Sequence, residues 1–212
     1  VIDTLGRLLD GDDDGTPGGD SVTTLTVAGP LPRVLSLPDF VRGPGQPVNI
    51  PATVSGIPIR LSDGTGVESL EFTLNYDPTL LTISDATLAA GLPAGSTLVA
   101  NLTVPGQLRV AMSFPTPLAA GAQDLLTLTA AIPETAPYRA KQVLDLSDVS
   151  INEGRLAAVG DDAVHLVAYF GDTTGNGSYS SLDGQRALRQ TVRLDSGFAA
   201  YPLADPVLIA DI

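Results

Sequence analysis

Gly66-Val-Glu-Ser-Leu-Glu-Phe-Thr-Leu-Asn-Tyr76 is the stretch of this chain that decides its fold class. Leu70, Phe72 and Leu74 alternate with mostly polar residues, and this period of two predicts a β-strand with one buried and one exposed face. A proline follows shortly after, and proline ends such a strand because it has no N–H to donate to a neighbour. The stretch therefore predicts a sheet that packs on a core through one side only.

Comparable short stretches recur over residues 21–170, separated by turns such as Pro105-Gly106. Many short strands at this spacing predict a β-sandwich in which each strand buries one face. A brief turn is expected within residues 85–94. The expected strands cover residues 21–27, 33–37, 47–54, 66–76, 80–83, 96–103, 107–114, 123–132, 143–151, 155–159 and 163–170.

The composition restricts the classes of function. The chain has 212 residues and a formal net charge of −13, which argues against nucleic-acid partners because phosphate binding requires basic patches. Aromatic residues make up only 5% and tryptophan is absent, so a sugar-stacking platform is not expected. There is no cysteine for disulfides or thiol chemistry, and no apolar run reaches the about 18 residues of a membrane span.

Residues 171–189 match a twelve-residue calcium loop that runs directly into a helix. Calcium is a hard cation that takes six to eight oxygen ligands, and alternate residues of such a loop surround one centre. Gly177 at the sixth position permits the sharp turn. The expected ligands, at loop positions 1, 3, 5, 7, 9 and 12, are Asp172, Thr174, Asn176, Ser178 through its backbone carbonyl, Ser180 and Asp183. The alternative is an Asx/Gly turn that caps the helix without a metal.

A helix is expected over residues 182–192, where apolar residues recur mostly at a spacing of three or four. The Asp183 carboxylate lies at its start, where a negative charge is favourable. Asp205-Pro206 suits the N-cap and first position of a further helix.

The N-terminal residues 1–21 form an acidic segment rich in glycine, which we interpret as a leading segment or linker. Asp10, Asp12 and Asp14 match the first half of a calcium loop, but no acid occupies the twelfth position. A loosely bound calcium ion there is the alternative. The chain begins at Val1 without a signal-peptide pattern, so we expect it to be part of a longer protein.

Few residues suggest catalysis. His165, the only histidine, lies in an alternating strand and is expected to be a strand-face residue. Two Asp-Pro bonds, Asp77-Pro78 and Asp205-Pro206, could serve calcium-triggered self-cleavage, but a strand-end turn and a helix N-terminus explain them better. We therefore predict that the chain is not an enzyme.

The block from about residue 33 to residue 167 resembles a cohesin domain, in the segment Gly43-Pro-Gly-Gln-Pro-Val-Asn-Ile-Pro-Ala-Thr-Val, in residues 66–83, and in Pro105-Gly-Gln-Leu-Arg-Val-Ala-Met-Ser. Residues 170–212 resemble a dockerin with one calcium loop and its helix, and a second loop would open at Asp211. Thr174 departs from the Asp or Asn usual at the third position of that loop. Only two charged ligands remain, so calcium affinity should lie at the weak end of the known range.

The resemblance implies a mainly β fold, a cohesin-like β-sandwich of jelly-roll type with a short C-terminal loop-helix element that binds calcium. The implied division is a leading segment at 1–21, the sandwich at 22–169 and the dockerin-like part at 170–212. One flat sheet face binds the partner in cohesins, so the strands near 66–76 and 107–114 are candidates.

We therefore expect a non-catalytic, calcium-binding interaction or structural module of a secreted bacterial surface or cellulosome-like assembly protein. Its partner would be a dockerin- or cohesin-like module or a further copy of itself, located outside the cell or on the bacterial surface. A carbohydrate-binding or adhesive β-sandwich is one alternative, and a calcium-triggered Asp-Pro self-processing segment is another.

Overall fold

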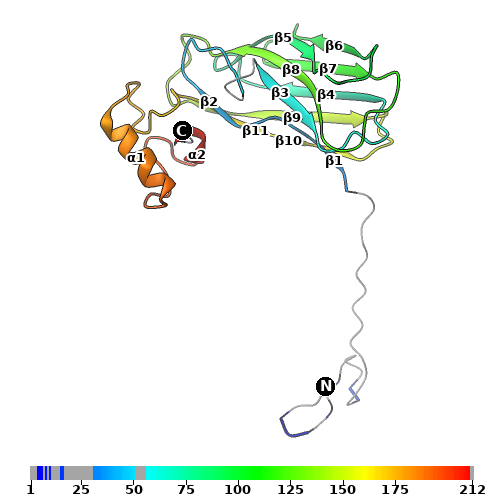
Figure 1. Cartoon of the computed structure of the whole chain (residues 1–212), viewed down its shortest axis with the longest axis horizontal. Coiled ribbons are helices and arrows are strands. Elements are labelled where there is room, and N and C mark those ends of the chain that lie inside the picture. Colours follow the sequence, from blue (N-terminus) through cyan, green and yellow to red (C-terminus); the bar gives the residue numbers. More distant parts are fainter. Residues whose placement is uncertain are drawn as a thin grey trace. The chain divides into compact units, whose positions relative to one another are not determined.

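In the described part of the chain, two β-sheets pack face to face and two short helices follow them (Figure 1). The structure, a computed structural model, describes residues 4–6, 8, 10, 15–16, 31–50 and 56–210. The chain divides into the units Val1–Leu31 and Pro32–Ile212, and every element named below belongs to the second unit. The elements are β1 (Arg33–Ser36), β2 (Phe40–Arg42), β3 (Ile57–Leu61), β4 (Ser69–Asn75), β5 (Thr82–Leu88), β6 (Thr97–Asn101), β7 (Gln107–Ser113), β8 (Gln123–Ala131), β9 (Lys141–Ile151), β10 (Ala158–Asp161), β11 (Ala163–Val167), α1 (Ser181–Thr191) and α2 (Val207–Ala210).

One sheet has the strand order β10-β1-β3-β8-β5 and the other β2-β11-β9-β4-β7-β6. Leu70, Phe72 and Leu74 of β4 are all buried, as their period of two predicts. In the register with β7, Phe72 is paired with Val110 and Leu74 with Leu108, so the apolar faces of neighbouring strands coincide. These side chains belong to one hydrophobic core between the sheets. The predicted mainly β sandwich is confirmed.

The first and last strands of the sandwich each change from one sheet to the other. β1 pairs in parallel with β10 in the five-stranded sheet, and β2 pairs in parallel with β11 in the six-stranded sheet. At the two breaks, Asp39 Oδ1 accepts the Val164 N–H at 2.7 Å and Asp162 Oδ1 accepts the Leu146 N–H at 2.8 Å. Carboxylates thus pair with strand amides where the strands leave one sheet for the other.

Most expected strands occur within a few residues of their predicted limits, but some regions differ. β5 runs on to Leu88, so the predicted end of this strand at residue 83 is wrong, whereas the brief turn expected within residues 85–94 occurs at residues 90–91. A register shift between Ile83 and Asp85 against β8 interrupts the alternation that the prediction relied on. Residues 47–50 form isolated bridges instead of a strand. The strand expected at 21–27 and the end of the one expected at 47–54 lie outside the described residues.

β3 is absent from the predicted strands. It contains Pro58, and proline is unfavourable in a central strand. The structure accommodates this proline by partial pairing. β8 pairs with β3 along its length, whereas β1 pairs with only Arg60 and Leu61. Pro58 therefore lies in the part of the strand that β1 does not reach.

The C-terminal segment packs on the outer face of the six-stranded sheet at its β2–β11 edge (Figure 1). Phe40 and Val167 face the core, so the alternating Val41 and Leu166 face the opposite side. We call the buried group that joins the two parts the docking cluster, and it consists of Val41, Leu166, Ala168, Ala187, Phe198, Tyr201, Ile209 and Ala210. The α1 helix, which carries Ala187, begins and ends one residue earlier than predicted.

No helix in the ranges that the structure describes has the length and apolar character needed to cross a membrane.

Candidate functional site

The outer face of the six-stranded sheet over β9, β4, β7 and β6 is the first candidate site. Because strand residues alternate, β4 presents Glu71, Thr73 and Asn75 here, opposite the core face. These four strands are described throughout and contain one aromatic residue, Phe72, which is buried in the core. The face is therefore a polar sheet surface without the aromatic platform that sugar binding requires.

Hydrogen bonds between side chains connect three strands of this face. Asn75 donates to Asp145 Oδ2 at 2.8 Å and to Ser147 Oγ at 2.9 Å, both on β9. Gln107 on β7 donates to Asn75 Oδ1 at 3.1 Å, and Arg109 Nε donates to Gln107 Oε1 at 2.9 Å. The network fixes side chains before a partner arrives, which lowers the entropy lost when an interface forms.

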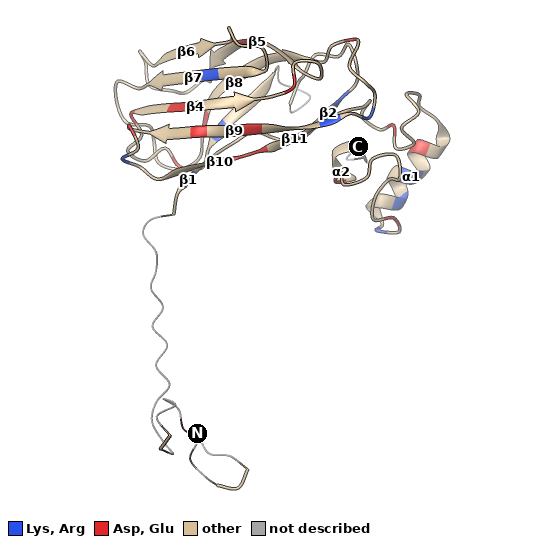
Figure 2. Ribbon diagram, turned by 180° about the vertical axis from the view of Figure 1, so that it is seen from behind, with Lys and Arg blue, Asp and Glu red and all other residues tan. Residues whose placement is uncertain are grey.

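Unpaired charges surround a shallow hollow of about 400 Å³ in this face. Acidic residues lie on β4 and β9 and a basic residue on β7 (Figure 2). Glu71, Asp148 and Arg109 all line the hollow, and none of the three forms an ion pair among the described residues. Asp148 has a φ of 53° at a register shift of β9 against β4, and its Oδ2 accepts the Thr73 hydroxyl at 3.2 Å. The hollow offers a partner both signs of charge.

The loop at residues 172–183 is the second candidate site, and its first acid is fully buried. Asp172 Oδ1 accepts the Thr174 hydroxyl at 3.0 Å and the Gly175 N–H at 2.9 Å, and Oδ2 accepts the Gly177 N–H at 2.7 Å. Gly177 has a φ of 78°, which is the sharp turn expected at the sixth loop position. The loop thus wraps around the carboxylate of Asp172.

Asp183, the last acid of the loop, is also buried and comes close to the same threonine. Its Oδ1 accepts the Thr174 N–H at 2.9 Å, and its Oδ2 accepts the Ser180 N–H at 2.8 Å and hydroxyl at 2.7 Å. Burial raises the pKa of Asp183, but the hydrogen bonds from Ser180 and Thr174 outweigh burial and hold the pKa well below its ordinary value. Both acids of the loop therefore converge on Thr174, and Asp183 is held as the carboxylate.

The cohesin-domain family model matches residues 35–165. The chain belongs to the cohesin family. Cohesin domains are non-catalytic interaction modules, in agreement with the prediction that the chain is not an enzyme. No curated protein matches the chain in sequence.

Solved cohesins have the same fold at low sequence identity. The sixth cohesin of scaffoldin B from Acetivibrio cellulolyticus, solved in complex with a dockerin, is 18% identical with a TM-score of 0.53, over 65% of this chain and 99% of that one. A cohesin from Clostridium acetobutylicum is 19% identical with a TM-score of 0.53, over 64% of this chain and 90% of that one. A non-cellulosomal cohesin from the archaeon Archaeoglobus fulgidus is 15% identical with a TM-score of 0.52, over 65% of this chain and 92% of that one.

Asn176, a further loop residue that the sequence singles out, donates its N–H to Asp172 Oδ1 at 3.3 Å. Asn176 Oδ1 accepts the Ser178 N–H at 2.8 Å, in an Asx turn. In the N-terminal unit, Asp10 Oδ2 accepts the Gly15 N–H at 2.8 Å. Three of the weaker candidates, Asp12, Asp14 and Asp211, lie outside the described residues.

Both Asp-Pro sequences of the cohesin chain form turns. Asp77 Oδ1 accepts the N–H of Thr79 at 2.8 Å and its hydroxyl at 2.6 Å. Asp205 Oδ1 accepts the Val207 N–H at 2.9 Å, as an N-cap of α2 does. These contacts are the structural roles that the sequence favours for both sites.

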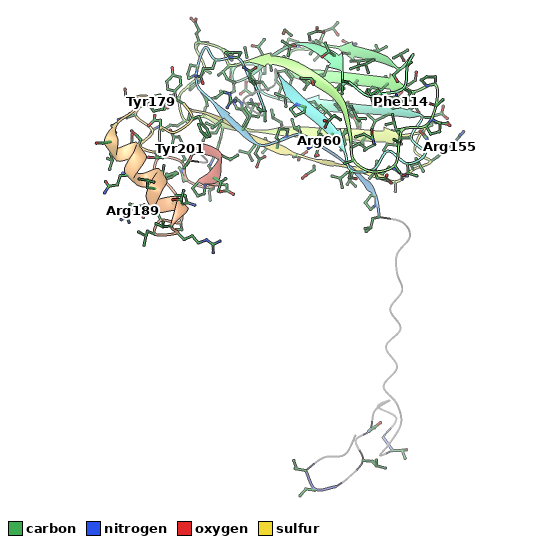
Figure 3. All side chains as sticks on the ribbon, viewed as in Figure 1. Arg60, Phe114, Arg155, Tyr179, Arg189 and Tyr201 are labelled. Atoms are coloured by element: carbon green, nitrogen blue, oxygen red, sulfur yellow. The ribbon has the colours of Figure 1, made fainter. Side chains whose placement is uncertain are left out.

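The sequence gives no indication of two tyrosines that contact Asp172 from outside the loop. Tyr138, between β8 and β9, donates its hydroxyl to Asp172 Oδ2 at 2.5 Å. Tyr201, which lies close to α2 (Figure 3), donates to the Asp172 backbone carbonyl at 2.8 Å. Each is more than 25 residues from Asp172 in sequence, at separations of 34 and 29. No local spacing connects such distant residues, so only the tertiary structure of this cohesin chain reveals them.

Proposed function

We propose that this chain is a protein-interaction module that binds a dockerin-like partner through the outer face of β9, β4, β7 and β6. The observation that carries the proposal is the polar network across three strands beside a hollow with unpaired Glu71, Asp148 and Arg109. A preorganised polar surface with unpaired charges of both signs suits a protein partner with complementary charges.

The family and the solved relatives support a partner of this kind. The cohesin of scaffoldin B from Acetivibrio cellulolyticus was solved in complex with a dockerin, and so was a cohesin from Clostridium thermocellum. A carbohydrate-binding role receives less support, because no aromatic side chain lies on the candidate face. A secreted or cell-surface location in a bacterial assembly is part of the same proposal.

Substitution of an exposed valine tests the proposed face. Val99 on β6 lines the hollow and is 64% exposed, so Val99→Arg changes the face without disturbing the core. Val159→Arg is the matched control, because Val159 is 45% exposed on β10 in the other sheet. Binding to a panel of isolated dockerin modules is measured by biolayer interferometry in millimolar calcium. We expect a captured dockerin to lose at least about tenfold in affinity with Val99→Arg, about 1.4 kcal/mol, and to bind Val159→Arg normally.

An equal loss with both variants, or none with Val99→Arg, would place the interface elsewhere. No binding to any dockerin of the panel would reject the dockerin-like partner.

We also propose that the loop at 172–183 binds calcium through Asp172, Thr174, Asn176, the Ser178 carbonyl, Ser180 and Asp183. The donor atoms are all oxygens, which suit calcium, and the two carboxylates converge on one residue. No cluster of three or more His, Cys, Asp or Glu side chains occurs at the described positions, so the charge available to a metal is small. A dissociation constant of about 10⁻⁴–10⁻³ M is therefore expected. Bound calcium would neutralise two buried carboxylates and so stabilise the start of α1.

Thermal melting with and without a chelator tests the calcium proposal. We expect millimolar calcium to raise the melting temperature of the chain, and Asp172→Asn to abolish this rise, because the ion stabilises the folded state that binds it. An unchanged melting temperature on addition of calcium would support the alternative, in which the turn caps α1 without a metal.

A further inference from the structure

The carboxylate of Asp172 is held by a residue of the sandwich. Tyr138 precedes β9 and donates to Asp172 Oδ2, and the same hydroxyl oxygen accepts the Tyr169 N–H at 3.0 Å. The rings of Tyr138 and Tyr169 lie 5.6 Å apart, centroid to centroid. Tyr138 is therefore held by contacts with Tyr169 in addition to its hydrogen bond to the loop.

The loop also lies tightly against the sandwich at Gly175. A Cβ added at this glycine would lie 3.0 Å from a carbon of the Arg139 side chain and 2.7 Å from that of Ala200. Gly175 has a φ of 69°, so both its conformation and its surroundings favour glycine. Arg139 follows Tyr138 directly, so one short segment of the sandwich contacts the loop at two points.

The docking cluster joins the same two parts of the molecule. Leu166 and Val41 of the sheet are 1% and 2% exposed because the C-terminal segment covers them. Lys141 Nζ on β9 donates to the Pro202 carbonyl at 2.7 Å, and the Gly171 N–H donates to the Ile209 carbonyl at 2.8 Å. The Lys141 contact thus joins the segment to the sheet after Asp172, and the Gly171–Ile209 bond joins the two ends of the segment to each other.

We propose that Tyr138 is a positioning residue for Asp172, and that calcium binding in the loop is thereby coupled to docking of the C-terminal segment on the sheet. The inference rests on the proposed calcium site. Oδ2 of Asp172 is held by Tyr138 and Gly177, so the carboxylate keeps one orientation toward the centre of the loop. Loss of such a hydrogen bond behind a ligand typically weakens metal binding by about 10–100-fold.

The coupling is reciprocal, because two linked binding events change each other's equilibrium by the same factor. Docking holds Tyr138 against Asp172 and favours calcium, so calcium must favour docking to the same extent. Removal of calcium is therefore expected to loosen the segment from Val41 and Leu166, while the core between the sheets stays closed.

The experiment uses the full chain with the variant Tyr138→Phe, which removes one hydroxyl and keeps the ring. Tyr179→Phe is the matched control: Tyr179 lies in the same loop and is 68% exposed, and its hydroxyl donates to the Phe170 carbonyl at 3.0 Å instead of to Asp172. Calcium affinity is measured by calorimetry. Hydrogen exchange of residues 171–210 is measured with calcium and with a chelator.

We expect Tyr138→Phe to weaken calcium binding at least about tenfold and to lose the calcium-dependent protection of residues 171–210. The control should keep the wild-type affinity within about twofold, and its protection should still respond to calcium. Tyr201→Phe removes the second hydroxyl on Asp172 and is also expected to weaken calcium binding, which keeps the test decisive if Tyr138→Phe does not fold.

Equal calcium affinity of Tyr138→Phe and wild type would overturn the inference and leave the calcium site intact. Unchanged exchange of residues 171–210 on calcium addition to the wild type would also overturn it. A wild-type chain that binds no calcium would reject the calcium site itself, and the coupling with it.

Discussion

His165 is a buried imidazole without a charge partner. It is fully buried and its ring stacks on Phe40, with centroids 4.5 Å apart. Asp77 donates its N–H to Gln142 Oε1, so the Gln142 amide donates to His165 Nδ1 at 2.9 Å and Nε2 carries the proton. Nε2 has no hydrogen-bond partner among the described residues. The surroundings of His165 therefore stabilise the neutral imidazole relative to the charged one.

Burial lowers the pKa of His165 from 6.5 to about 4. Between these values the unfolded chain binds more protons than the folded chain, so the free energy of unfolding falls as the pH falls from 6.5 towards 4. Above pH 6.5 the imidazole is largely neutral in both the folded and the unfolded chain, so His165 causes no loss of stability there. We expect a loss of about 2 kcal/mol at pH 5 from this residue, measured by urea unfolding over that pH range.

His165→Phe isolates this effect, because phenylalanine keeps the ring against Phe40 and does not titrate. The variant should lose the histidine part of the pH dependence and keep the part that carboxylates cause. If the pH dependence of unfolding is the same in both proteins, the imidazole binds protons equally in the folded and unfolded chains and this account of its pKa is wrong.

The sequence places Asp172 and Asp183 in one loop, and in the structure both contact Thr174, but it gives no sign of the residues that contact the loop from outside it. Calcium-loop spacing identifies Asp172 and Asp183 because ligands and turn all lie within one short stretch. Tyr138 and Tyr201 have no such pattern, since their role depends on contacts across the fold. The charges of Glu71, Asp148 and Arg109 gather on one face through strand register, which one strand's alternation does not specify.

At the scale of elements, β11 is a strand buried on both sides. Ala163 and Val167 face the core, whereas Leu166 faces the C-terminal segment. An alternating pattern predicts one exposed face, so sequence reasoning assigns β11 a solvent side that it largely lacks. β3 is also missing from the predicted strands. Proline is unfavourable in a central strand, and only the pairing of β3 with β1 and β8 shows how Pro58 is accommodated.

Leu166→Ala should loosen the C-terminal segment without opening the sandwich. Truncation of a buried leucine costs about 2–5 kcal/mol, and here the lost contacts belong to the docking cluster. We expect amide exchange of residues 171–210 to become at least about 30-fold faster, while β4 and β7 keep their protection. Hydrogen exchange with mass spectrometry measures both regions in one experiment.

Val164→Ala is the matched control, because Val164 lies two residues earlier on the same strand face and outside the docking cluster. It should leave residues 171–210 close to wild type. Faster exchange throughout the sandwich with Leu166→Ala would show that the two parts open as one unit.

At the scale of the whole molecule, the C-terminal segment and the candidate binding face occupy different parts of one face of the six-stranded sheet. The segment covers the β2–β11 edge of the outer face, and the candidate binding face over β9, β4, β7 and β6 is the other part of the same surface. The family match covers residues 35–165 and ends before the loop. The sandwich core is thus complete before the segment that docks on it begins, which makes their separate contributions to stability measurable.

A chain shortened to residues 32–168 should still fold as a sandwich, because its core lies between the two sheets and includes no residue beyond Val167. Removal of the segment exposes Val41, Leu166 and Ala168, and the lost burial is expected to cost about 3 kcal/mol. For a chain of this size that corresponds to a fall of about 6–12 °C in melting temperature. Circular dichroism and calorimetry of the two chains measure the difference.

The exposed apolar edge should also make the short chain self-associate at high concentration, which light scattering detects. A short chain that fails to fold would show that the docked segment is an essential part of the cohesin core, and a chain with an unchanged melting temperature would show that docking contributes nothing to its stability.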